Sequence, residues 1–365
     1  MDAIDLFNSD HLELPKKWES YPNSFDLFLE ETFRNYLTFL GKIDSTDYIS
    51  VQLKANINIA QKLCDDIKEV LKLQFNGYPA KAFNKLKAAL TLIDVHIKAL
   101  LSSPNISKEL SHLYRMRTGG SNSLSRRELF HIPFELRHLV NTQRYSIPGL
   151  PCLYFGGSTY VCWEELGRPQ LDSIHLARFK PVDGVSVRVL DLGYRPAEIA
   201  VYLDHEKDNV KTDNKKAQFI IAQGLCWPLI AVCSIRVRYK DAPFKPEYIL
   251  PQLLLQWITE STDCDGVRFF STKIQQYIGF PTPICNFAFP SRTITPKGFC
   301  TTLTSKFELS EPLYWQLAKG SGLPAEHPPN MHFRLKLAEG AEVDYINTEF
   351  GMMQFYLAPL PCKKI

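Results

Sequence analysis

Apolar residues recur every three or four positions over residues 57–71 and again over 83–101, with lysines and acidic residues between them. This spacing is typical of amphipathic helices that bury one face. The tetrapeptide NGYP (76–79) separates the two stretches. With the segment 24–43 before them, they predict three helices and a helical N-terminal unit over residues 1–106. The recurring apolar residues are Ile57, Ala60, Cys64, Ile67 and Leu71, then Phe83, Leu86, Leu90, Ile93, Ile97 and Leu101.

From residue 107 the pattern changes to short apolar runs separated by glycine and proline. Such runs are typical of strands, and periodic stretches between them predict helices. We therefore expect an α+β protein in which a mixed α/β domain (107–300) follows the helical bundle. A strand-rich C-terminal extension (301–365) would pack on that domain, and 205–216 would be an exposed loop. The predicted strands are 151–157, 185–193, 229–239, 266–272 and 284–290, with helices near 158–167, 194–203, 216–225 and 248–260.

One segment resembles a membrane span, since residues 217–235 carry no charge. It contains two glutamines, a glycine and a proline, and charged residues flank it. A helix end followed by a buried strand explains it better than a span does. We therefore expect no membrane contact.

Composition and charge indicate a cytoplasmic globular protein. Apolar residues make up 45% of the chain and charged residues 22%, and the net charge of +3 is too small to favour nucleic acid as a partner. The nine cysteines are scattered without a CxxC pair, which is typical of reduced, buried thiols. The acidic N-terminus lacks the apolar core of a signal peptide.

Several familiar signatures are absent: GxxxxGK[ST], GxGxxG, GxSxG and HExxH. Phosphate-loop, dinucleotide-fold, hydrolase and zinc-protease functions therefore lose their main support. His131 and His138 are seven residues apart, and His327 and His332 lie in a proline-rich segment. This spacing favours structural or solvated histidines, and we expect no metal site.

The stretch 143–169 holds charged residues among glycines, prolines and apolar residues. It predicts a strand, a turn and a helix on which Glu164 and Arg168 form a surface pair. Glu165 would then fall on the more apolar face, where a carboxylate is costly unless something pairs with it. Arg144 and Tyr154 are nearby candidates. Spacing alone slightly favours a structural Arg–Glu pair over a catalytic carboxylate.

The order of these residues resembles that of the RES family, named for its arginine, glutamate and serine. Arg144 precedes a strand that carries Tyr154, and Glu165 lies on the next helix, at steps of ten and eleven residues. Downstream, GVRFFSTK places Ser271 at the end of a strand and ICNFAFP contains Asn286; upstream, LYRMR contains Arg115. The chain departs from the family where Gln-Arg-Tyr replaces the usual Gly-Arg-Trp around Arg144. The helical unit and the C-terminal extension have no counterpart in compact members.

The resemblance implies an ADP-ribosyltransferase-like fold that cleaves the nicotinamide–ribose bond of NAD⁺. Glu165 would stabilise the positively charged ribose, and Ser271 would orient the ribose or the carboxamide. Arg115 and Arg144 would hold the pyrophosphate, while Tyr154 would border the nicotinamide. Asn286 would contribute to binding, although as a lone residue it is more typical of a structural turn.

The substrate would be NAD⁺, with water or inorganic phosphate as acceptor and with no further cofactor. The resemblance implies a growth-arrest toxin or defence effector with an antitoxin or regulatory partner, and a homo-oligomer stays open. Two alternatives stay open beside it: a non-catalytic nucleotide-binding regulatory protein, and an ADP-ribosyltransferase that acts on a macromolecule.

Overall fold

The computed structural model describes residues 1–18, 24–103, 106–120, 123–205, 214–274, 277–278, 284–320 and 333–365; for 277–278 it describes the backbone alone. The predicted loop at 205–216 lies mostly outside this part of the chain. The chain forms two compact units. The first comprises Met1–Pro104, Gln143–Ser146 and Leu190–Cys264, and the second comprises Asn105–Thr142, Ile147–Val189 and Asp265–Ile365. The units are therefore not consecutive, unlike the domains that the sequence predicts.

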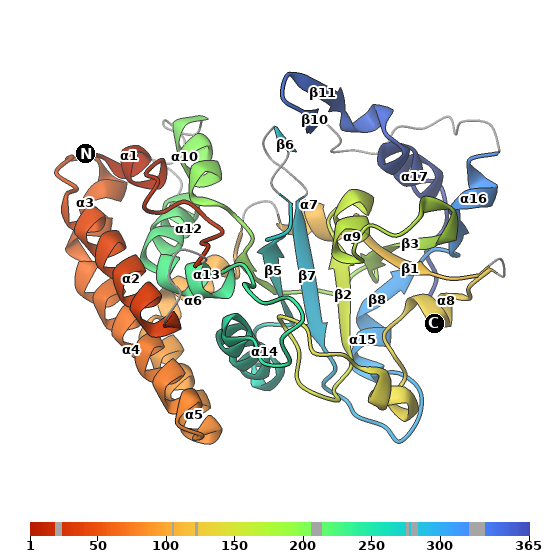
Figure 1. The fold of residues 1–365 in the computed structure, drawn as a ribbon, viewed down its shortest axis with the longest axis horizontal. Coiled ribbons are helices and arrows are strands. Elements are labelled where there is room, and N and C mark those ends of the chain that lie inside the picture. The colour runs from red at the N-terminus through yellow and green to blue at the C-terminus, as the bar shows by residue number, and fades with distance from the viewer. Residues whose placement is uncertain are drawn as a thin grey trace. The chain divides into compact units, whose positions relative to one another are not determined.

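The first unit is helical, and α2, α4 and α5 lie side by side in it (Figure 1). The predicted three-helix pattern is resolved into shorter pieces, since Asn56 and Ile93 interrupt the helical dihedrals between neighbouring helices. Pro79, in the first turn of α5, starts that helix because its missing N–H is not needed there. The helices of this unit are α1 (Ala3–Phe7), α2 (Phe25–Gly41), α3 (Tyr48–Ala55), α4 (Ile57–Phe75), α5 (Pro79–Leu92), α6 (Asp94–Leu100), α10 (Pro196–His205), α12 (Asn214–Leu225), α13 (Trp227–Cys233) and α14 (Ile249–Glu260).

The predicted strand at 229–239 is wrong. Its first residues belong to α13, and no strand follows. Every residue of α13 is buried, and a short apolar run that is buried all round has no periodicity to distinguish strand from helix. Pro228, in the first turn, favours the helix. Among the described residues no single helix has the length and hydropathy of a membrane span; α12 and α13 reach them only together, across a 60° bend.

The second unit is built on an eight-stranded sheet with the order β4-β5-β7-β2-β1-β3-β8, in which β9 also pairs with β3. Strands β5, β7 and β2 run next to each other (Figure 1). A three-stranded sheet has the order β11-β10-β6. With these sheets and the helices, the protein has the predicted α+β class. The strands are β1 (Leu113–Thr118), β2 (Cys152–Gly156), β3 (Ile174–Pro181), β4 (Val189–Leu192), β5 (Gly266–Phe270), β6 (Tyr277–Ile278), β7 (Cys285–Pro290), β8 (Phe307–Leu309), β9 (Leu313–Tyr314), β10 (Arg334–Ala338) and β11 (Ala341–Asp344).

Short helices complete the second unit. The C-terminal part is less strand-rich than its sequence predicts, because the run 342–350 leaves the strand at Asp344 and continues into α17. Thr348 starts that helix by accepting a hydrogen bond from the Gly351 N–H. The helices are α7 (Ile106–Leu110), α8 (Arg126–Leu129), α9 (Thr159–Glu165), α15 (Thr301–Lys306), α16 (Trp315–Ala318) and α17 (Glu349–Leu357).

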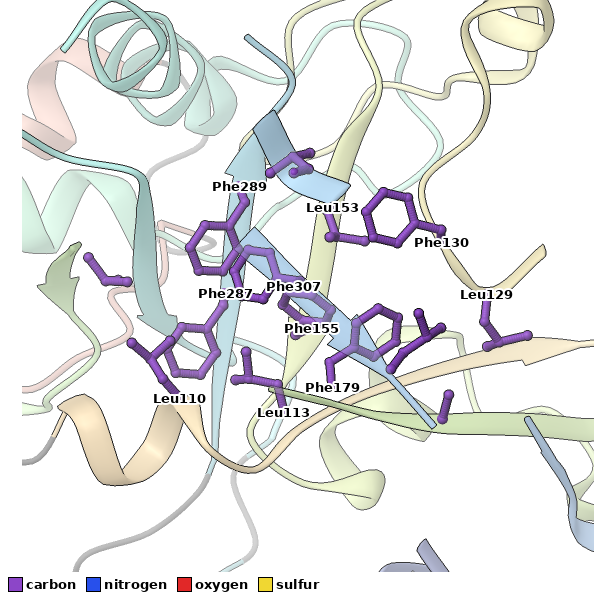
Figure 2. Close-up of a cluster of buried hydrophobic side chains, with 14 of the residues drawn as sticks. Leu110, Leu113, Leu129, Phe130, Leu153, Phe155, Phe179, Phe287, Phe289 and Phe307 are labelled. Atoms are coloured by element: carbon purple, nitrogen blue, oxygen red, sulfur yellow. The ribbon is translucent and has the colours of Figure 1, made fainter. Parts of the chain in front are cut away.

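The two faces of this sheet differ in character. Phe155 lies opposite Phe287, and Leu153 opposite Phe289, across the β2–β7 pair. These four side chains belong to one buried apolar cluster (Figure 2). Because side chains alternate along a strand, Tyr154, Gly156 and Asn286 lie on the other face. Helix α9 packs there, since the Cys162 Sγ–H donates to the Tyr114 carbonyl (3.2 Å).

Candidate functional site

A glycine lets α9 begin close to the sheet. A Cβ atom at Gly156 would lie 2.7 Å from Cys162 Sγ and 2.9 Å from the Ser158 carbonyl oxygen, closer than real Cβ atoms come. Ser158 is the N-cap and accepts a hydrogen bond from the Val161 N–H. The predicted strand, turn and helix at 151–167 are therefore confirmed, and Glu165 is the last residue of α9.

The C-terminal segment holds α9 from another side. The Thr159 hydroxyl donates to the Phe350 carbonyl (2.8 Å), and the Thr159 N–H donates to Gln354 Oε1 (3.3 Å). Gln354 is buried and also donates to the Tyr114 hydroxyl (3.1 Å). A buried polar network restricts movement because each broken hydrogen bond leaves a costly unpaired group. The predicted C-terminal extension thus fixes the position of the site helix.

One carboxylate oxygen of Glu165 is held by two buried donors. Glu165 Oε1 accepts hydrogen bonds from Ser271 Oγ (2.7 Å) and from Asn286 Nδ2 (3.0 Å). Ser271 immediately follows β5 and is fully buried, while Asn286 lies in β7 and is 7% exposed. The structure therefore brings together three of the predicted residues, which are 106 and 121 positions apart in the chain.

The other carboxylate oxygen faces a lysine that sequence reasoning missed. Lys273 Nζ lies 3.0 Å from Glu165 Oε2 and donates to the Glu165 main-chain oxygen (2.8 Å). The Lys273 N–H also donates to Ser271 Oγ (3.3 Å). The signal was present in GVRFFSTK: Lys273 comes two residues after Ser271. In the Glu165 carboxylate, Oε1 is therefore held by two buried donors, whereas Oε2 lies beside the half-exposed ammonium group of Lys273.

The sequence predicts Glu164 on the solvent face of α9 and Glu165 on its apolar face, but the exposures of the two side chains are the reverse. Glu164 pairs with Arg168 as expected (Nε–Oε2 3.0 Å), but its side chain is only 4% exposed, whereas that of Glu165 is 33% exposed. Burial and a hydrogen bond with Glu164 raise the pKa of Tyr160. The predicted solvent face is covered by apolar residues far away in the chain, and periodicity within α9 cannot show this. The cluster around Tyr160 and Val161 contains Ile274, Ile284, Phe333, Leu335, Tyr345 and Phe355.

Arg115 is a half-buried cation on β1. Its Nη1 donates to the Tyr154 carbonyl (2.9 Å), and its Nε has no hydrogen-bond partner in the described part of the chain. Burial and the nearby Arg117 lower the pKa of Arg115 to about 10, so the guanidinium stays charged at neutral pH. No carboxylate forms an ion pair with it among the residues described. A cation with a shielded, unpaired N–H donor is costly without an anion, which makes Arg115 a candidate anion-binding residue.

Arg144 lies in the first unit, whereas Glu165, Ser271, Asn286, Tyr154 and Arg115 all lie in the second. Its Nη1 and Nη2 donate to the carbonyls of Cys233 (3.1 Å) and Ile235 (2.9 Å). The guanidinium also lies 5.3 Å from the centre of the Tyr248 ring. In this position Arg144 holds the segment 143–146 against the end of α13.

The histidine and cysteine side chains that can be described do not gather into a metal-ligand group. No cluster of three or more His, Cys, Asp or Glu side chains occurs among the described residues, while His327 and His332 lie outside them. His131 is buried, with Nδ1 bonded to the Ile132 carbonyl (2.7 Å) and Nε2 accepting from the Cys300 N–H (2.9 Å). Both of its nitrogens therefore serve the fold. No disulfide joins the nine cysteines, all of which are described, and eight are buried.

Comparison with known proteins places the chain in a family. No family model matches it, and no solved structure matches it. The chain is 32% identical over 368 aligned positions to the "Putative toxin YopC" of Bacillus subtilis (strain 168). The match covers 98% of this chain and 80% of that protein. Identity of this extent over almost the whole chain shows common descent, and the protein therefore belongs to the family of the Bacillus subtilis "Putative toxin YopC".

Proposed function

We propose that this protein is an NAD⁺-consuming toxin that cleaves the nicotinamide–ribose bond. The carboxylate of Glu165, fixed by Ser271 and Asn286 and reachable from solvent, carries the proposal. The order of the motif residues resembles that of the RES family, and this resemblance supports NAD⁺ as the substrate. The printed name of the Bacillus subtilis relative supports the toxin role.

The geometry of Glu165 suits a reaction that develops positive charge. Cleavage of the bond gives an oxocarbenium-like ribose, which a fixed anion stabilises without having to reorganise. The two buried donors bind Oε1, whereas Oε2 lies beside the half-exposed Lys273. Nicotinamide leaves as a neutral molecule with the bonding electron pair, so no general acid has to protonate it. This chemistry therefore needs no histidine beside Glu165.

Arg115 stays a predicted pyrophosphate contact. A pyrophosphate would supply the counter-charge that this half-buried guanidinium lacks among the described residues. Tyr154 is half-buried on the same strand face as Gly156, which lies opposite Asn286. Its ring would border the nicotinamide. Arg144 stays a predicted pyrophosphate contact, and loss of NAD⁺ affinity in Arg144→Ala with unchanged unfolding would support it.

The test is nicotinamide release from NAD⁺ by the purified chain, with and without phosphate. We expect Glu165→Gln to slow release by about 10²–10³-fold, the usual effect of losing one electrostatic transition-state contact. Glu164→Gln is the matched control, because it changes the adjacent carboxylate, and it should keep most of the activity. Absence of release in both buffers, with Glu165→Gln as toxic in cells as the parent chain, would disprove the proposal.

The same assay separates the alternative functions. NAD⁺ labelled in its adenylate part would leave label on protein or nucleic acid if the chain transferred ADP-ribose to a macromolecule. Binding of NAD⁺ without any product would indicate a regulatory protein. Free ADP-ribose or its phosphate ester as the labelled product supports the proposed cleavage.

A further inference from the structure

We infer that Gln354 is a positioning residue, because its side-chain amide joins the helix that carries Glu165 to the strand that carries Arg115. Gln354 lies in α17, in the C-terminal segment, and is only 4% exposed. Its effect on turnover rests on the proposed function, whereas its effect on α9 can be measured independently of any reaction.

The orientation of the Gln354 amide is fixed by its neighbours. The Thr159 N–H, in the first turn of α9, donates to Gln354 Oε1 at 3.3 Å. A main-chain N–H can only donate, so the amide oxygen has to face α9 and the amide nitrogen has to face away from that N–H. Gln354 Nε2 accordingly donates to the Tyr114 hydroxyl of β1 at 3.1 Å. One buried side chain therefore bridges α9 and β1.

The bridge adds a further link between α9 and β1. Near the middle of the helix, the Cys162 Sγ–H already donates to the Tyr114 carbonyl (3.2 Å). A helix held at one point can pivot about it, whereas a link at its first turn fixes its direction. Glu165 is as many residues from Cys162 as Thr159 is, so a movement at the start of α9 would displace the Glu165 carboxylate by a similar distance. Because Tyr114 immediately precedes Arg115, the bridge also holds the carboxylate and the predicted pyrophosphate contact at a fixed spacing.

Gln354 is itself held in place. Helix α17 packs beside α9 (Figure 1). Gly351 brings α17 close to the turn Tyr345–Asn347, since a Cβ atom at Gly351 would lie 2.8 Å from Ile346 Cα, closer than real Cβ atoms come. The Tyr345 hydroxyl, which is fully buried, also donates to Gln354 Oε1. The amide oxygen therefore has two donors, and turning it away would leave both of them buried and unpaired, which is costly.

The experiment measures nicotinamide release by the full chain and, in parallel, hydrogen exchange of the amides in 159–166. Gln354→Met keeps the length of the side chain and removes its hydrogen bonds. We expect kcat per folded molecule to fall about tenfold or more, with a smaller change in the KM for NAD⁺, because a misplaced carboxylate affects the transition state more than binding. The α9 amides should exchange roughly five- to tenfold faster, the effect of losing about one hydrogen bond. Circular dichroism gives the folded fraction.

Further variants separate positioning from general stability. Tyr114→Phe removes only the β1 half of the bridge, and it provides the test if Gln354→Met folds poorly. The double variant should have the kcat of Gln354→Met, since both changes break the same link. Gln354→Glu should restore much of the kcat, because its carboxylate accepts from the Thr159 N–H and from a Tyr114 hydroxyl that turns to donate. Gln223→Met is the matched control: Gln223 is a buried glutamine of the first unit, 2% exposed, and its loss should leave kcat per folded molecule unchanged.

The outcomes distinguish this inference from the proposed function. If the parent chain releases nicotinamide, an unchanged kcat per folded molecule or unchanged exchange in α9 would overturn the positioning role and leave the cleavage reaction standing. If the parent chain releases none, the proposed function fails, and exchange in α9 alone decides whether Gln354 positions the helix. An equal loss in Gln223→Met, or additive losses in the double variant, would also overturn the inference.

Discussion

The two faces of the central sheet carry different tasks, although neighbouring residues of the same strands form them. On one face Phe155 and Phe287 lie opposite each other within a buried apolar cluster. On the other, Gly156 and Asn286 lie opposite each other beside the Glu165 carboxylate. The alternation of a strand thus places a core residue and a site residue at consecutive positions. A substitution of the core residue should therefore lower stability, and a substitution of the neighbouring site residue should lower activity.

The largest expected effect is on the apolar face. Phe287 is fully buried, and Phe287→Ala should lower the free energy of unfolding by about 3–5 kcal/mol, because it removes apolar contacts and leaves a cavity. Urea denaturation followed by circular dichroism measures this. The neighbouring Asn286→Ala should cost about 1 kcal/mol. Equal losses in the two variants would show that the faces do not differ as described.

An intermediate effect is expected on the pH dependence of the free energy of unfolding, through His131 on the apolar side of the sheet. Burial, together with the charges of Arg115 and Arg117, lowers the pKa of His131 from 6.5 to about 4. Between these values the unfolded chain binds a proton that the folded chain does not, so stability is present above pH 6.5 and is lost as pH falls toward 4. At pH 5 His131 should cost about 2 kcal/mol relative to pH 7.5.

The measurement is urea unfolding at pH 7.5 and pH 5.0 for the parent chain and for His131→Gln. Glutamine keeps a hydrogen-bond acceptor for the Cys300 N–H but does not titrate in this range. The loss of stability on acidification should be smaller in the variant by the contribution of His131. The same loss in both chains would assign the pH dependence to other groups.

The smallest effect is expected on the site face. Asn286→Ala should slow nicotinamide release by about tenfold, since it removes one of two donors on Glu165 Oε1 and leaves Ser271 in place. The decrease should be in kcat more than in the KM for NAD⁺, because the lost contact orients the carboxylate. Steady-state kinetics measures both constants. A change confined to KM would assign Asn286 to substrate binding.

Local periodicity predicted the N-terminal helices, the α+β class and the strand–turn–helix that ends at Glu165. It failed where burial depends on distant segments. The run at α13 has the pattern of a strand because it is apolar throughout. The face of α9 that carries Tyr160 has the pattern of a solvent-facing surface because residues that cluster with Tyr160, such as Phe355, are far away in the sequence. The pattern within one segment cannot show which distant residues pack against it in the folded protein.

The sequence predicts only part of the site, because some of its residues are recognisable only from their positions in the folded protein. The order of motifs predicts Glu165, Ser271 and Asn286 as site residues, and the structure places them within hydrogen-bonding distance. Lys273 was overlooked because a lysine after a strand is ordinary on its own and gains meaning only from the position of Glu165. The order and spacing of motifs also predict Arg144, which belongs to the other unit because the chain passes between the units several times.

The long separation between Glu165 and its two donors affects how the protein is made. A ribosome adds roughly 5–20 residues per second, and 121 positions separate Glu165 from Asn286. The nascent chain would therefore carry an unsupported carboxylate for roughly 6–24 s. If the site acts as proposed, a chain that stops early in translation is harmless to the cell that produces it. Toxicity would begin only after Asn286 has been synthesised and has reached Glu165.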